Sequence, residues 1–267
     1  MSQLMVVKKH LNLAWEMIKL NIASAMEYRA SFLIQVLGMI VNDVGLIFLW
    51  LIFFQKFPVV GGWDFTDSAL LFAVTTTSFG FFMIFGGGAM TIARMIHQGQ
   101  LDYFLTFPTN TLWHVVVSRT EIPAIGDFIF GLAIYLIFID YSLGSILLFL
   151  GVAILSALIF INFIIITQSI GFFVGNFEAA AEQLFHALLG FTLYPQSVFH
   201  GWLKVIMLTI IPAFFIATLP VSLLNNFDWN VLLVMFLFWL VTLWLAIWIF
   251  YRGMRDYESG NLINVQM

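Results

Sequence analysis

Long apolar stretches separated by short polar intervals dominate this chain. A helix needs about 20 predominantly apolar residues to cross the hydrocarbon core of a bilayer. We therefore predict an all-α integral membrane protein, a single transmembrane domain over residues 1–267. Its six expected spans are residues 31–54, 69–93, 122–139, 143–174, 184–198 and 231–250.

Two further apolar segments depart from this pattern. In residues 1–25 the apolar positions recur at steps of three and four, with polar residues on the other side of the helical wheel. This pattern predicts an N-terminal amphipathic helix that lies in the membrane interface. Residues 203–224 are apolar but contain Pro212 and Pro220, which favour a broken helix. We expect an outer re-entrant helical hairpin there, before the last span.

The basic residues predict the orientation. If the hairpin does not cross, only Lys56 and Lys204 lie on the side opposite the N-terminus. Basic residues gather on the cytoplasmic side of membrane proteins. Both termini, including the tail at residues 252–267, are therefore expected in the cytoplasm. The basic residues on that side are Lys8, Lys9, Lys19, Arg29, Arg94, Arg119, Arg252 and Arg255.

Composition supports the membrane prediction and excludes several kinds of site. The chain is 62% hydrophobic and 9% charged, so its charges are too few to solvate a soluble domain of 267 residues. It has no cysteine, which excludes disulfides and thiolate metal sites. The net charge of −4 gives no basic patch for nucleic acid. There is no phosphate-loop motif and no dense histidine or carboxylate cluster, so we expect no catalytic residue, metal or cofactor in this chain.

Polar side chains inside the expected spans are candidates for a translocation path. Asp43, beside Asn42, lies halfway along the first span. A carboxylate inside the membrane usually faces a cavity or a partner. Asp43 can therefore serve in transport, or it can only fix the packing by a hydrogen bond to a neighbouring span. Asn162 and Gln168 in the fourth span either line a polar route or form hydrogen bonds between helices, the commoner role.

Glu121 and Asp127 lie near the start of the third span. We expect them at the cytoplasmic interface, solvated or paired with Arg119 or Arg94, rather than in transport chemistry.

The polar loop at residues 94–119 contains a short amphipathic segment that ends at Pro108. An apolar helical face in such a loop needs a surface to cover it, either a groove on a soluble partner or the membrane interface. We place Leu101, Phe104 and Leu105 on that face.

The order of these parts resembles the membrane subunit of type-2 ATP-binding-cassette exporters. More narrowly, the chain is similar to bacterial ABC-2 family transporter proteins from residue 27 to residue 260. The matching stretches are Glu27-Tyr28-Arg29, Gly62-Trp63, Gly99-Gln100-Leu101-Asp102 with Leu105 and Pro108, Tyr194-Pro195, Pro212-Ala213-Phe214 with Pro220, and Tyr251-Arg252-Gly253 with Arg255, Tyr257, Glu258 and Ser259.

The resemblance implies a permease in the bacterial cytoplasmic membrane, without enzymatic activity of its own. Two permeases, this chain with a second copy or a paralogue, would be surrounded by membrane lipids and driven by two separate ATPase subunits that bind ATP and Mg²⁺. The outer hairpin would act as a lid whose bends are set by its two prolines. The implied ATPase-coupling helix comprises Gly99, Gln100, Leu101, Asp102, Phe104, Leu105 and Pro108.

One residue of this segment departs from the family pattern. Relatives often carry Lys or Arg just before the proline, where this chain has Phe107. A basic contact with the ATPase at that position is therefore unsupported.

Two alternatives remain beside the exporter. A self-contained channel or secondary transporter would rely on Asp43, and an integral membrane enzyme would need polar residues clustered at one depth. Neither accounts for the amphipathic cytoplasmic segment. A hydrophobic small molecule, a lipid or a lipid-linked glycan each remain possible substrates.

Overall fold

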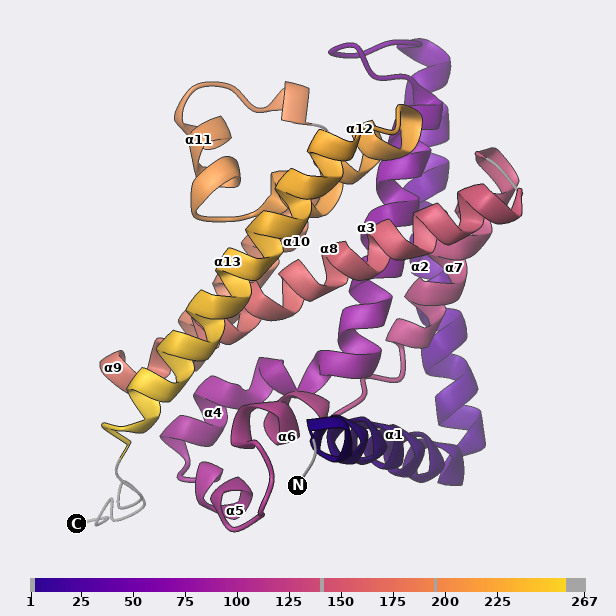
Figure 1. Ribbon diagram of the computed structural model, residues 1–267. Helices are drawn as coiled ribbons and strands as arrows, with labels where there is room; N and C mark the ends of the chain where they lie inside the picture. Colours follow the sequence, from indigo (N-terminus) through magenta and orange to yellow (C-terminus); the bar gives the residue numbers. More distant parts are fainter. Residues whose placement is uncertain (1–2, 140–141, 195, 258–267) are drawn as a thin grey trace, which may run out of the picture.

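The computed structural model describes residues 3–139, 142–194 and 196–257 (Figure 1). Within them the chain is 83% helical and has no strand. The family-like residues Pro195, Glu258 and Ser259, and most of the expected tail at 252–267, lie outside the described residues.

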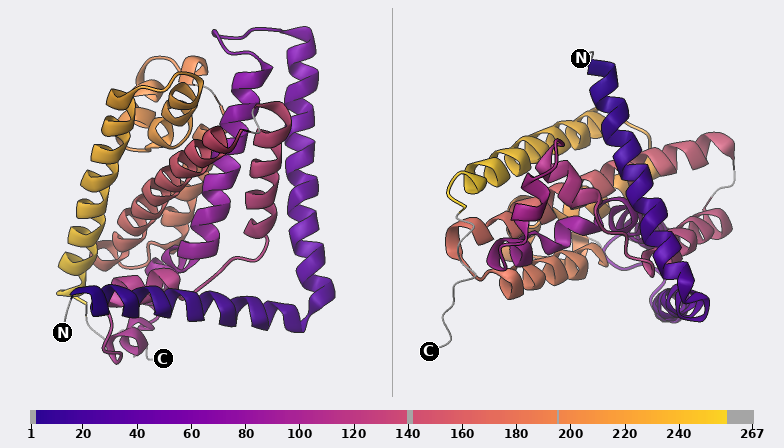
Figure 2. Two further views of the ribbon diagram at one scale, coloured as in Figure 1. Left: turned by 45° about the vertical axis from the view of Figure 1, so that its right-hand side comes forward. Right: turned by 90° about the horizontal axis from the view of Figure 1, so that it is seen from below.

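The first helix, α1 (Gln3–Glu27), runs across one end of the bundle, and the chain then turns into α2 (Arg29–Lys56), which runs along the bundle, as Figure 2 shows. It occupies the place predicted for the interfacial helix at residues 1–25. Leu11 and Trp15 on this helix each expose 60% of their surface, so its apolar side is not fully covered by the rest of the chain.

Four helical segments are long and apolar enough to cross a membrane: α2, Phe65–His97, Leu143–Val174 and Trp229–Met254. The stretches predicted as spans at 122–139 and 184–198 form α7 (Ala124–Phe138) and α10 (Glu178–Thr192), each of 15 residues. At 1.5 Å per residue each helix measures about 22 Å, short of a hydrocarbon core of about 30 Å. The count of four, or five with the bent pair described next, is therefore lower than the six expected.

Residues 203–224 form a bent pair rather than one straight helix. The helix α11 (Trp202–Thr209) and the segment Phe214–Asn225 meet at 70°. Pro212 lies in the break, and Pro220 is the second residue of α12 (Leu219–Asn225), which continues directly from a π-helical turn over Phe214–Thr218. In Figure 1 both arms lie in the upper half of the bundle.

The span at Phe65–His97 is not straight either. It consists of α3 (Phe65–Gly86), the short 3-10 helix η1 (Gly87–Thr91) and α4 (Ile92–His97). A Cβ atom at Gly88 would collide with the carbonyl oxygens of Val115 and Val116, so glycine here allows α6 (Thr111–Val117) to pack directly below α3. This turn sends α4 and the following loop sideways from the bundle (Figure 1).

The remaining elements complete the two ends of the bundle. They are α5 (Leu101–Leu105), α8 (Leu143–Ser169), α9 (Gly171–Val174), η2 (Gln196–Val198), the π-helix η3 (Phe214–Thr218) and α13 (Trp229–Met254).

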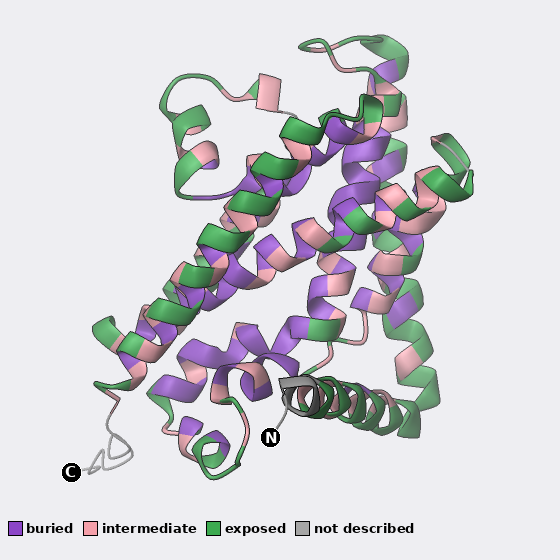
Figure 3. Ribbon diagram, viewed as in Figure 1, coloured by how far each residue is buried: buried purple, intermediate pink, exposed green. Residues whose placement is uncertain are grey.

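The core surrounds α3. In the apolar part of Phe65–His97, 78% of residues are buried, against 17% in α2 and in α13 (Figure 3). Phe82 of α3 stacks on Phe160 of α8 with ring centroids 5.9 Å apart. On its other side α3 approaches α7 so closely that a Cβ atom at Gly80 would lie 2.6 Å from the backbone nitrogen of Phe128. α3 is therefore the central helix, with α2 and α13 at the periphery.

We expect Gly80→Ala to lower the thermal stability of the purified chain, because the added methyl group meets backbone that cannot move aside. Overpacking of this kind costs about 1–3 kcal/mol. The matched control is Gly151→Ala in α8, where an added Cβ has no atom within 4 Å and helix propensity improves. Thermal unfolding in detergent measures both, and equal melting temperatures for the two variants would contradict the close contact of α3 and α7.

Candidate functional site

Two buried aspartates face each other between α2 and α7. Asp43 is 3% exposed and Asp127 is 2% exposed, and their side chains form a hydrogen bond. Neither Oδ2 atom receives a hydrogen bond from an N–H or hydroxyl group of the described residues. A hydrogen bond between two carboxyl groups requires a proton on one of them.

The carboxyl pair lies next to a close approach of the two helices. One residue before Asp127, a Cβ atom at Gly126 would lie 2.6 Å from the carbonyl oxygen of Val36 in α2. Asn42 adds a side-chain hydrogen bond to Asp43. The prediction that Asp127 is solvated or paired with a cytoplasmic arginine is therefore wrong. The sequence predicted where Asp127 lies along its helix, but it could not predict that α2 packs against this residue and buries it.

The other two path candidates do not join this pair. Asn162 of α8 donates from Nδ2 to the carbonyl oxygen of Trp239, at 3.2 Å, and to Thr242 Oγ1, at 3.0 Å, both on α13. Gln168 accepts a 3.0 Å bond at Oε1 from the backbone N–H of Ala93, in the first turn of α4, where helical N–H groups have no partner in their own helix. Both amides thus connect helices.

The segment predicted to couple to an ATPase extends from the end of α4. Gly99 has a φ of +69° and follows the last turn of α4, while the N–H of Gln100 bonds to the carbonyl of Met95. This geometry ends a helix with glycine in the left-handed region. The chain then forms α5, a helix of only five residues.

The outward side of this segment differs from the predicted one. Leu101 is fully buried and Phe104 is 7% exposed, so these two side chains point into the chain. The exposed apolar side chains are Tyr103, Leu105 and Phe107. The sequence pattern could not predict which side of α5 faces outward, because a helix of five residues is too short to show a period.

His114 of α6 is buried beneath this segment and packs against its aromatic side chains. The rings of Phe104 and Phe107 each pack edge-on to it with centroids 5.0 Å away, and Thr109 Oγ1 lies 3.4 Å from its Nδ1. Burial lowers the pKa of His114 below its ordinary value of 6.5. Nothing in its sequence spacing distinguishes His114 from the other four histidines of the chain, so its position in this region could not be predicted.

Contacts with the C-terminal end of α13 complete this region. The Asp102 carboxylate lies beside the Tyr257 hydroxyl, and burial together with this charge raises the pKa of Tyr257 to about 12. Phe172 of α9 contacts the rings of both Tyr257 and Phe250. Asp102 and Tyr257 belong to separate matching stretches of the sequence, and the structure brings them together.

Replacing one member of the carboxyl pair should destabilise the chain more than replacing both. Asp43→Leu leaves Asp127 buried without a partner, which costs about 1–3 kcal/mol. Asp43→Leu/Asp127→Leu removes both polar groups and should recover part of that loss. Thermal unfolding of the two single variants and the double variant measures the coupling, and strictly additive losses would show that the side chains do not interact.

Acid should weaken the packing around His114. Because its pKa in the folded chain is lowered, the unfolded chain binds more protons below pH 6.5, so this contribution to stability is complete above pH 6.5 and declines as pH falls. His114→Gln should flatten the dependence of melting temperature on pH between about 7 and 5. His97→Gln is the control, and an identical slope in both variants would contradict the assignment.

A family model described as ABC-2 family transporter protein matches residues 40–260, which include the carboxyl pair, the α4–α6 region and the bent pair. Searches of curated proteins and of solved structures each found no match. The match covers well over half of the chain and agrees with its apolar helices. The chain belongs to the ABC-2 transporter family and is a transmembrane permease of an ABC transporter.

Proposed function

We propose that this permease is half of an exporter and that two separate ATPase subunits, which bind ATP and Mg²⁺, drive it through the α4–α6 region. The observation that carries the proposal is the exposed apolar group Tyr103, Leu105 and Phe107 at the end of the bundle. Exposed aromatic and aliphatic side chains grouped in this way are typical of contacts with a partner protein. A second permease, a copy or a paralogue, completes the translocation path.

The proposed topology retains six crossings. The short helices α7 and α10 cross where the bilayer thins locally, at a modest cost. The bent pair at 203–224 returns to the outer face and acts as a lid, with Pro212 at its bend and Pro220 inside its second arm. The ends that carry eight of the basic residues are then cytoplasmic, in a bacterial inner membrane. Support comes from Figure 1, in which α1, α4–α6 and the C-terminal end lie at the same end.

In the proposed cycle, closure of the ATPase dimer pushes α5. Arg94 of α4 forms an ion pair with Glu178 of α10 at 3.2 Å, and Gln168 links α8 to α4. These contacts make the lower ends of α3, α8 and α10 respond together. Rocking of the two permeases then opens the path to the outside.

A self-contained channel or secondary transporter that uses Asp43 is less well supported. Asp43 lies against Asp127, and it does not line either of two cavities found among the described residues, of about 800 and 400 Å³. An ion-coupling carboxylate is expected to face such a space.

The test is co-purification of tagged chain from its native membrane, followed by an ATPase assay. Tyr103→Asp and Leu105→Asp should lower the amount of co-purified ATPase at least tenfold, about 1.4 kcal/mol, while membrane insertion stays normal. Val59→Asp is the matched control, because Val59 is equally exposed in the loop at the other end of α2. Leu101 and Phe104 are unsuitable for this test, since both are packed in the core.

Two results would count against the proposal. One is normal ATPase recovery in both variants. The other is transport by the isolated chain in proteoliposomes without ATP, which would favour the self-contained transporter.

A further inference from the structure

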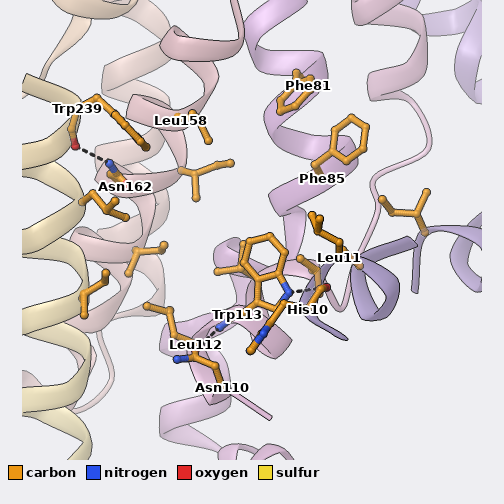
Figure 4. Close-up of a pocket in the computed structure, with 18 of the residues that line it drawn as sticks. His10, Leu11, Phe81, Phe85, Asn110, Leu112, Trp113, Leu158, Asn162 and Trp239 are labelled. Carbon is orange, nitrogen blue, oxygen red and sulfur yellow. Dashed lines mark hydrogen bonds between the residues drawn. The ribbon is translucent and has the colours of Figure 1, made fainter. Parts of the chain in front are cut away.

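A cavity of about 800 Å³ lies above α1, between α3, α6, α8 and α13. Its size falls within the range of about 300–1,000 Å³ typical of small-molecule sites. Most of the lining is apolar or aromatic, including Phe81, Phe85 and Leu158 (Figure 4).

Polar groups lie at both ends of this cavity, but the amide of Asn162 beside Trp239 already bonds to α13 through its Nδ2. Figure 4 shows His10 and Asn110 at the end formed by α1 and α6, whereas Phe81, Leu158 and Trp239 lie toward the other end. Trp113 donates from Nε1 to the carbonyl oxygen of His10, at 3.0 Å. A mostly apolar space with His10 and Asn110 at one end matches an amphiphile rather than a uniformly polar molecule.

One wall of the cavity is formed by α1, the amphipathic N-terminal helix. Leu11 and Trp15 line the cavity and are still 60% exposed. A helix of this kind inserts its apolar side among acyl chains just below the lipid headgroups. The cavity therefore opens at the depth where the acyl chains of one leaflet begin.

Charge complementarity indicates the headgroup. Lys8 precedes Leu11 by three residues and Trp15 by seven, so it lies on the same stripe of α1, and its side chain is exposed. Lys9 beside it donates from Nζ to the carbonyl oxygen of Pro108, at 3.0 Å. Lys8 does not line the cavity itself, but it is an exposed cation on α1 two residues before His10 and one helical turn before Leu11, which both do.

We propose that this cavity binds an anionic phospholipid from the leaflet that contacts α1, with an acyl chain between α3, α8 and α13 and the headgroup beside Lys8. The bound lipid holds α1 against the bundle, because the acyl chain fills the space between Leu11 and α8. This role is separate from the identity of the exported substrate and from the ATPase contact.

The experiment uses the full chain in nanodiscs that contain phosphatidylglycerol with a photoreactive diazirine on its acyl chain. Peptides that carry lipid adducts are mapped by mass spectrometry. Adducts are expected on α1 around Leu11 and on α3 around Phe85. Ala14→Trp and Leu158→Trp, which fill the cavity from opposite walls, should each reduce these adducts at least fivefold.

The matched control for the cavity is Ala23→Trp, an exposed position on α1 outside the cavity. Thermal unfolding of each variant confirms that the chain is folded. Equal labelling in the filled variants and the control overturns the proposal, and so does labelling confined to the loops at the other end of the bundle. Crosslinks between two copies through these peptides, without lipid adducts, show that a second chain covers the cavity and also overturn it.

The headgroup is tested by Lys8→Glu, with Lys56→Glu at the far end of α2 as control. Labelling by the phosphatidylglycerol probe should fall severalfold in Lys8→Glu alone, while a phosphatidylcholine probe changes little in either variant. An equal loss for both probes overturns the anionic preference. None of these readouts depends on ATPase recovery, so failure here and failure of the proposed function are distinguishable.

Discussion

Close packing of α3 against α7 is the contact on which the rest of the structure depends. Glycine at position 80 allows the two backbones to meet, and Gly131 accommodates Thr76 and Thr77 of α3 in the same way. Between helices in a membrane, van der Waals packing supplies much of the attraction, because lipid tails are as apolar as the side chains. With α7 held on one side and α8 on the other, α3 becomes the central helix around which α2 and α13 are arranged.

Buried polar groups then decide which helices are linked. In hydrocarbon an unpaired polar group is costly, so a buried amide or carboxyl group is stabilised by a partner on a neighbouring helix. The pair Asp43 and Asp127 joins α2 to α7, Asn162 joins α8 to α13, and Gln168 joins α8 to α4. These polar side chains thus specify the neighbours of helices whose apolar surfaces alone are nearly interchangeable.

Much of the helical architecture follows from the sequence, because apolar length and proline positions are local properties. They predicted α1, the four long apolar segments and the break at Pro212. The pairing of Asp43 with Asp127 and of Asp102 with Tyr257 depends on how helices distant in sequence pack, which periodicity in a single helix does not contain. The direction of Leu101 and Phe104 was misjudged for a related reason: α5 is five residues long, and its orientation is set by His114 and α6.

The contacts between helices divide the chain into a larger group, α3, α8, α10 and α13, and a pair, α1 and α2. The lower ends of α3, α8, α10 and α13 are joined through α4, α9 and their ion-paired and aromatic contacts, so a displacement of α5 reaches several helices at once. By contrast, α1 and α2 meet the bundle through α7, through α6, through a smaller contact with α3 and along the edge of an apolar cavity. A lipid chain in that cavity adds apolar contact where the protein itself supplies little. The central helices therefore form the closely packed part of the chain, through which the proposed ATPase contact at α5 would act.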